Sequence, residues 1–313
     1  MIAALCIVFL AWFTMKFYMD NSNDSETDAY VNALSVSATA RTVAVDGTGH
    51  YAGFAPYFIR PFTAALEPIT GAYKIRGFVF ARVVLGLALY ALAYAWNRRL
   101  GIGWLTSLVG LMLLSTSVAF AQLARGWELE KFIEPVLFLV AGLAVWNRHY
   151  LVLLATAALA AANRETGIFV PLVALAGVAE QSSGLRSAIQ SWRVWACAII
   201  SVLEVVLLSR VIPPETVLAW TSDVSVERLV YVIGGLCLLP LLAVIWVGSA
   251  PPGLRRLFYL VAPVWIALVL TTDRLEQGAA LLAPLALLFV PVTLVGVEQL
   301  VGKPRERYAA RRR

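Results

Sequence analysis

The stretch "AANRETGIFVP" sets an arginine and a glutamate side by side, Arg164 and Glu165, inside a run from residue 150 to 179 that is otherwise free of charge. Burying an ionised side chain is costly unless the charge is paired or serves a function, so such positions are the first candidates for a site. Other charged residues within apolar runs include Arg82, Glu134, Glu204 and Arg210.

The chemistry that these arginines offer is anion binding. A guanidinium group matches phosphate oxygens with two parallel N–H donors and stays charged when it is partly desolvated. Arg60, Lys74 and Arg76 stand close to the start of the second apolar run, and could join Arg82 and Arg164 around one phosphate.

A structural role for Arg164 is the alternative. Its guanidinium could pair with Glu134, Glu165 or Glu204 and simply hold helices together. Of these acids, the adjacent Glu165 is the favoured partner.

A candidate general base follows the first apolar run. In "TDAYVNAL", Thr27 or Asp28 is expected to cap a helix whose apolar stripe begins directly afterwards. A carboxylate fixed there could take a proton from a hydroxyl group, although capping alone would also explain Asp28. Asp20, Asp24 and Glu26 are expected to form a solvated cap.

The composition predicts that all of these residues belong to a helical membrane protein. Of 313 residues, 60% are hydrophobic and 14% charged, and the mean hydropathy is +0.79, far from the soluble norm of about 25% charged residues. We expect one membrane domain, residues 1–313, with an all-α fold. The three cysteines and two histidines have no ligand-like spacing, so neither a metal site nor a cofactor is indicated.

Apolar runs of helical length recur along the whole chain. They cover residues 2–19, 77–96, 102–122, 131–146, 150–179, 194–211, 229–248, 257–271 and 279–297.

The connectors between the runs alternate in charge. Connectors such as "NRRLG", "NRHY", "SSGLRSAIQSWR" and "SAPPGLRR" are basic, whereas "DNSNDSETDAY", "ARGWELE" and "TTDRLEQG" contain at least as many acidic residues as basic ones. The positive-inside rule places the basic set in the cytoplasm, together with both termini. The basic tail, residues 300–313, is expected to meet anionic lipid headgroups rather than nucleic acid.

Basic connectors on both sides of the 150–179 run require it to cross the membrane an even number of times. We therefore expect two short helices, at about 150–162 and 167–179, that meet at residues 163–166 near the outer face, and about ten passes in all. Because helices this short do not reach both interfaces, we expect their meeting point to lie in a depression filled by water or substrate. A single long tilted helix is the alternative.

The longest connector, residues 20–76, is predicted to form an external first loop with interfacial helices. Its second half, "GHYAGFAPYFIRPFTAALEPITGAYKIRG", is rich in aromatic residues and places Tyr57, Arg60 and Pro61 before the second membrane helix.

At these residues the chain resembles the GT-C superfamily of polytopic membrane glycosyltransferases. The resemblance rests on an acid soon after the first helix, Asp28 with Asp24 and Glu26 as rivals, on "PYFIRPF", and on "NRETGIFVPLVAL" between short helices. "TDAY" lacks the Asp-Asp or Asp-Glu pair of the better-known members.

The resemblance implies transfer of a sugar from a polyprenyl phosphate donor to an acceptor at the outer face of a bacterial plasma membrane. Asp28 would be the base. The substrate-binding residues would be Arg164, Glu165, Arg60, Tyr57, Arg82 and Glu134. Two other classes stay open, namely a transporter or flippase of a lipid or anionic solute, since broken helices often mark transport sites, and a non-catalytic membrane scaffold.

Overall fold

The computed structural model describes residues 1–21, 42–45, 48–51, 74–123, 130–182, 184–209, 236, 238–271 and 282–301. This part of the chain is almost entirely helical, as predicted, and adds one antiparallel hairpin that pairs Val43 with His50. The strands are β1 (Thr42–Val45) and β2 (Thr48–Tyr51). The helices of the first half are α1 (Ile2–Asn21), α4 (Lys74–Arg99), α5 (Trp104–Leu123), α6 (Glu130–Trp146) and α7 (Tyr150–Asn163).

The second half of the chain contains shorter and more irregular helices. They are the 3-10 turn η1 (Glu165–Phe169), α8 (Val170–Gln181), α9 (Leu185–Ile189), α10 (Trp192–Ser209), α12 (Leu239–Trp246), η3 (Val247–Ser249), α13 (Pro252–Thr271), α14 (Leu282–Pro284), the π-helical η6 (Leu285–Phe289) and α15 (Val290–Leu300).

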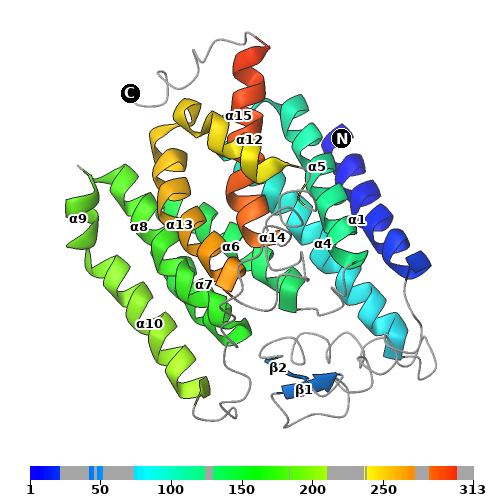
Figure 1. Cartoon of the computed structure of the whole chain (residues 1–313), viewed down its shortest axis with the longest axis horizontal. Coiled ribbons are helices and arrows are strands. Elements are labelled where there is room, and N and C mark those ends of the chain that lie inside the picture. The colour runs from blue at the N-terminus through cyan, green and yellow to red at the C-terminus, as the bar shows by residue number, and fades with distance from the viewer. Residues whose placement is uncertain are drawn as a thin grey trace.

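The long helices run side by side in alternating directions (Figure 1). Contacts between helix termini fix this arrangement. The Arg99 Nε at the end of α4 donates to Asn147 after α6 at 2.9 Å, so α4 and α6 are parallel. The Tyr150 hydroxyl at the start of α7 donates to Gln181 at the end of α8 at 2.6 Å, so α7 and α8 form a hairpin.

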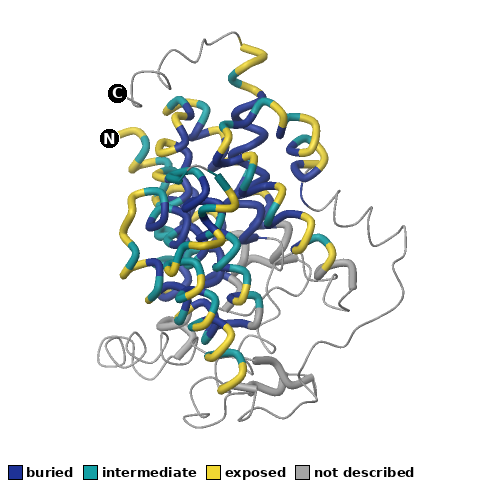
Figure 2. Tube along the Cα trace, turned by 90° about the vertical axis from the view of Figure 1, so that its left-hand side faces the viewer, coloured by how far each residue is buried: buried dark blue, intermediate teal, exposed yellow. Residues whose placement is uncertain are grey.

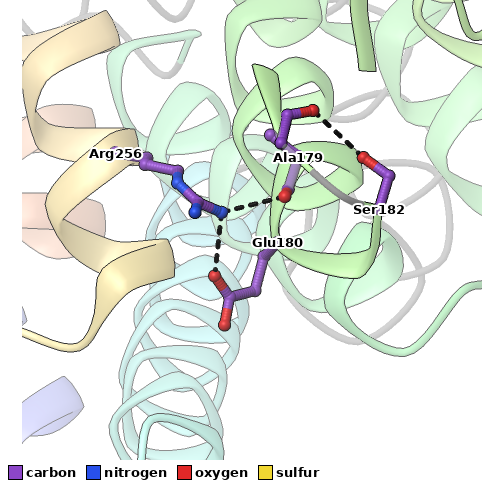
Figure 3. A network of polar contacts seen from close by, with 5 residues as sticks. Ala179, Glu180, Ser182 and Arg256 are labelled. Carbon is purple, nitrogen blue, oxygen red and sulfur yellow. Dashed lines mark hydrogen bonds and ion pairs between the residues drawn. The ribbon is translucent and has the colours of Figure 1, made fainter. Parts of the chain in front are cut away.

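The same end of the bundle carries the connectors that the sequence marks as basic. There, Arg256 at the start of α13 donates to the Ala179 carbonyl at 2.8 Å and pairs with Glu180 at 3.2 Å (Figure 3). The Gly103 N–H before α5 donates to Glu298 of α15 at 2.6 Å. We call this the basic end, and the other the far end.

Buried side chains form one continuous core along the bundle, with exposed residues around it (Figure 2). The exposed residues include many large apolar side chains, such as Trp12, Trp104 and Leu151, as expected where lipid rather than water surrounds a bundle. The largest fully buried side chains are Trp96, Trp265, Tyr90, Phe138 and Phe289.

A turn of π-helix interrupts the buried C-terminal helix. In an α-helix the N–H of residue 291 would donate to the carbonyl of Leu287, but Pro291 has no N–H. The indole Nε1–H of Trp96, from α4, donates to the Leu287 carbonyl at 3.0 Å instead. A side chain from another helix thus satisfies the carbonyl that the proline leaves without its usual donor.

Two of the described helical segments, Val79–Arg99 and Leu282–Leu300, are long and apolar enough to cross a membrane by length and composition. Shorter apolar helices of 10 to 17 residues accompany them. Within the predicted external loop, the structure describes the two strands but not the segment expected to form interfacial helices. The predicted basic tail lies outside the described residues apart from its first two positions.

Candidate functional site

The "NRET" segment breaks the chain between α7 and α8. α7 ends at Asn163, Arg164 is extended at φ −155° and ψ 156°, and η1 leads into α8, which carries Pro171 in its first turn. The Arg164 N–H donates to the Ala160 carbonyl at 3.0 Å, and its own carbonyl accepts from the Gly167 N–H at 2.9 Å. The break therefore falls where the sequence predicts it.

Gly167 makes this turn possible because it lies directly against the end of α7. A Cβ atom at residue 167 would stand 2.2 Å from the carbonyl carbon of Ala160 and 2.3 Å from the amide nitrogen of Ala161. Both neighbours are backbone atoms that cannot rotate away, so only glycine fits.

The side chain of Arg164 enters the bundle and pairs with Glu134 of α6. The Arg164 Nη1 lies 2.7 Å from the Glu134 Oε2, and only 8% and 3% of the two side chains are exposed. The Thr166 hydroxyl donates to the other carboxylate oxygen, Oε1. Two residues of the break thus hold both oxygens of one buried carboxylate.

Helix termini favour this arrangement of charge. Arg164 stands at the C-terminal end of α7, where the helix dipole is negative, and Glu134 lies one turn inside the N-terminus of α6, where it is positive. The pair is therefore stabilised by its own two helices as well as by mutual attraction.

Arg82 occupies a second polar position, on α4. Arg82 is 4% exposed, and its guanidinium carbon lies 4.3 Å from the centre of the ring of Phe132 on α6. This is cation–π geometry, which is worth more in a desolvated setting than at the surface.

A pocket opens beside Arg82, between α1, α4, α5 and α6. Its empty volume, including the mouth, is about 270 Å³. Among the described residues, the pocket is lined by Ala11, Thr14 and Met15 of α1, Arg82, Gly86, Leu89 and Tyr90 of α4, Val118 of α5 and Phe132 of α6.

α6 separates the two arginines. Phe132, which contacts Arg82, and Glu134, which pairs with Arg164, are two residues apart and hence about 200° apart around the helix. Arg82 near the start of α4, Glu134 near the start of α6 and Arg164 at the end of α7 all lie toward the far end of the bundle.

The structure thus brings Glu134 and Arg164 into contact and places Arg82 toward the same end of the bundle, on the other side of α6. Arg164 pairs with Glu134, one of the three partners that the sequence offers, whereas the side chain of Glu165, the favoured one, lies outside the described residues. Glu204 of α10 is half-buried. The remaining predictions fall on residues or side chains outside the described part, namely Asp28, Tyr57, Arg60, Arg210 and the side chain of Glu165.

Sequence reasoning missed the neutral residues of the site. Thr166 completes the "RET" triplet, and its position beside two charges was the available signal. Phe132 and Tyr90 are aromatic residues in apolar runs, and nothing in their local sequence distinguishes them from core residues. Among the described residues there is no group of three or more His, Cys, Asp or Glu side chains that could hold a metal ion.

No protein-family model, curated protein or solved structure matches the chain.

Proposed function

We propose that this chain is an integral membrane protein of about ten helical passes, with both termini in the cytoplasm, and that it acts as a GT-C-like glycosyltransferase. The reaction moves a sugar from a polyprenyl phosphate donor to an acceptor hydroxyl at the outer face of the membrane. The far end of the bundle is then the outer end, and the basic end is cytoplasmic.

The observation that carries the proposal is the collection of buried charges at one end of the bundle. Arg82, Glu134 and Arg164 all lie toward the far end, and all are at most 6% exposed. Charges that served only to join helices would have no preferred end. A reaction that releases a lipid phosphate gains most from fixed cations in a partly dry site, which is the environment that Arg82 and Arg164 occupy.

In the proposed site, the residues divide into two groups. Arg164, together with Arg60 and Tyr57 from the first loop, binds the donor phosphate, and Arg82, which α6 separates from Arg164, contacts another part of the donor. Glu134 and Thr166 hold Arg164 in place. Asp28 accepts the proton of the acceptor hydroxyl as the new glycosidic bond forms and the phosphate leaves with the electrons of the old bond.

The position of the "NRET" break supports this proposal over a transporter. Transporters place broken helices near the membrane midplane and often repeat them in related halves. Here the break is the tip of the α7–α8 hairpin, as the contact between Tyr150 and Gln181 at its other end requires.

The test is sugar transfer by the purified full chain in lipid nanodiscs, with a panel of radiolabelled polyprenyl-phosphate sugars and membrane-extract acceptors. We expect transfer by the native chain and its loss in Asp28→Asn, with protein yield and thermal unfolding unchanged. Asp24→Asn and Glu26→Gln are matched controls that should keep activity.

Two outcomes count against the proposal. Full activity of Asp28→Asn would remove this residue from the mechanism. Movement of an intact anionic lipid or solute across sealed vesicles, with no covalent change in any donor, would favour a transporter instead.

A further inference from the structure

The short helix α9 and the first turn of α10 form one corner of the basic end, residues 184–195, which we call the α9 corner. Figure 1 shows α9 beside the ends of α8 and α10. Ala188 of α9 is fully buried, and the Trp195 indole Nε1–H of α10 donates to the Ile189 carbonyl at 2.7 Å. These two contacts hold α9 against the bundle.

The α9 corner exposes a group of large apolar side chains. They belong to Leu185, Ile189, Trp192 and Trp195, and Trp192 is the most exposed of them at 66%. Tryptophan is enriched where a membrane meets water, because its ring can lie in hydrocarbon while its N–H stays near polar groups. The apolar part of the corner therefore suits the upper ends of lipid acyl chains.

The charge of the α9 corner is positive throughout. The sequence has no aspartate or glutamate between Glu180 and Glu204, whereas Arg186 and Arg193 lie in that interval. Among the described residues, neither arginine side chain forms an ion pair or a hydrogen bond. Arg256, at the same end of the bundle, differs because it pairs with Glu180. The two arginines of the corner are therefore available to an anion from outside the chain.

Arg193 is held in position by an aromatic ring. Its guanidinium carbon lies 3.9 Å from the centre of the Tyr150 ring of α7. The Tyr150 hydroxyl donates to Gln181 of α8, and the Gln181 side-chain amide donates to the Val145 carbonyl of α6. Contact with a ring face orients the guanidinium without using its N–H donors, which match phosphate oxygens. Arg193 is therefore a pre-positioned anion-binding group.

We propose that the α9 corner binds an anionic phospholipid of the cytoplasmic leaflet. Arg193 and Arg186 contact the phosphodiester headgroup, while Trp192 and Leu185 lie against the first methylene groups of the acyl chains. A free phosphate ion would gain nothing from these exposed apolar side chains, so a lipid is the better match. The inference shares with the proposed function only the orientation of the chain in the membrane, and it does not require sugar transfer.

The structure supplies matched variants for the charge. Arg193→Gln and Arg186→Gln each remove one positive charge from the α9 corner. Arg255→Gln removes one from another connector of the basic end, because Arg255 is exposed at the start of α13. All three variants change the net charge equally, so only a local site makes them differ.

Two variants of Tyr150 test whether its ring positions Arg193. Tyr150→Phe keeps the ring and loses the hydrogen bond to Gln181, whereas Tyr150→Leu loses the ring as well. Lipid binding should therefore survive in Tyr150→Phe and weaken in Tyr150→Leu.

The experiment titrates lipid into the full chain in non-ionic detergent and follows thermal unfolding. The probes are dioleoyl phosphatidylglycerol, which is anionic, dioleoyl phosphatidylcholine, which has the same acyl chains but no net charge, and soluble glycerol phosphate. We expect the anionic lipid to raise the unfolding temperature most. Its dissociation constant should rise about fivefold in Arg193→Gln and in Arg186→Gln, and stay unchanged in Arg255→Gln.

Three results would overturn the inference. The two lipids could stabilise the chain equally, glycerol phosphate alone could give the full shift, or Arg255→Gln could weaken binding as much as Arg193→Gln does. If Arg193→Gln does not fold, Arg186→Gln and the two Tyr150 variants decide instead, and native affinity in all three would refute the site. Absence of sugar transfer leaves every one of these measurements intact.

Discussion

Glu134 is the residue on which the "NRET" break depends, because it accepts from Arg164 and Thr166 at once. A buried ion pair contributes little net stability compared with apolar residues of the same shape, but removal of one partner leaves the other as an uncompensated buried charge. The consequence is that single and double substitutions at this pair should behave very differently.

Glu134→Gln should lower the free energy of unfolding by about 3–5 kcal/mol, because it removes the buried carboxylate charge that Arg164 and Thr166 contact. Chemical denaturation in detergent micelles measures the change. Glu180→Gln is the matched control. It breaks the ion pair with Arg256, whose side chains are 41% and 26% exposed, and should cost about 1 kcal/mol or less.

The double variant Glu134→Leu with Arg164→Leu should lose less unfolding free energy than the two single variants lose in sum. The difference should be at least about 1 kcal/mol. The same double variant should lose sugar transfer if Arg164 binds the donor. A double variant that transfers sugar normally would leave the pair with a purely structural role.

Local sequence could identify Arg164 as unusual but could not choose among Glu134, Glu165 and Glu204 as its partner. Adjacency favours Glu165, whereas the described partner lies thirty positions earlier on another helix. Such a contact depends on how helices pack, and one sequence contains no direct record of that. The same holds for Phe132, whose ring meets Arg82 only because α4 and α6 are parallel neighbours.

At the scale of elements, the α7–α8 hairpin depends on one glycine. Gly167→Ala should destabilise the chain by about 3 kcal/mol or more, because the new Cβ would overlap backbone atoms of Ala160 and Ala161. Gly248→Ala, where a Cβ would meet nothing within 4 Å, should change stability by less than about 0.5 kcal/mol. Equal effects of the two variants would mean that the hairpin does not close as described.

The π-helical turn gives a second prediction. Trp96→Phe should cost about 1–3 kcal/mol beyond the lost packing, because the Leu287 carbonyl loses its indole donor. Pro291→Ala restores a backbone N–H and should reduce the penalty of Trp96→Phe, which a double-mutant cycle of unfolding free energies detects. Trp195→Phe is the control, since its indole donates to the Ile189 carbonyl at an exposed site and its loss should cost less.

The two elements differ in how far they could be predicted. The α7–α8 hairpin could be predicted from the connectors, because basic connectors on both sides of an apolar run require that run to cross the membrane an even number of times. The π-helical turn had no such signal. Pro284 and Pro291 predict only an irregular helix, and the donor that makes the irregularity tolerable belongs to a helix some 190 residues earlier.

For the whole molecule, the arrangement of helix termini predicts which connectors share one side of the membrane. His149 before α7 and Gln190 after α9 are both exposed and both at the basic end. In a background free of the three natural cysteines, His149→Cys and Gln190→Cys should react with a membrane-impermeant thiol reagent only after cells are opened. Asn23→Cys, in the predicted external loop, should react in intact cells.

Labelling of His149→Cys and Gln190→Cys from opposite sides would refute the hairpin as a pair of membrane passes.

The helical bundle could be predicted from the sequence, because apolar runs of suitable length recur along the chain. The number of passes depends more on the connectors. Of the described helical segments, two have both the length and the composition of a full span, and the others are shorter.

The lengths of α7 and α8 have a consequence for the choice of surrounding lipid. With 14 and 12 residues, these helices extend about 21 Å and 18 Å along their axes, against about 30 Å for the hydrocarbon of an average bilayer. If their basic end is held at the headgroups, the tip with Arg164 lies about 10 Å below the opposite surface. Longer acyl chains would deepen that recess and shorter ones would bring Arg164 level with the water, so acyl-chain length should control how easily a polar substrate reaches it.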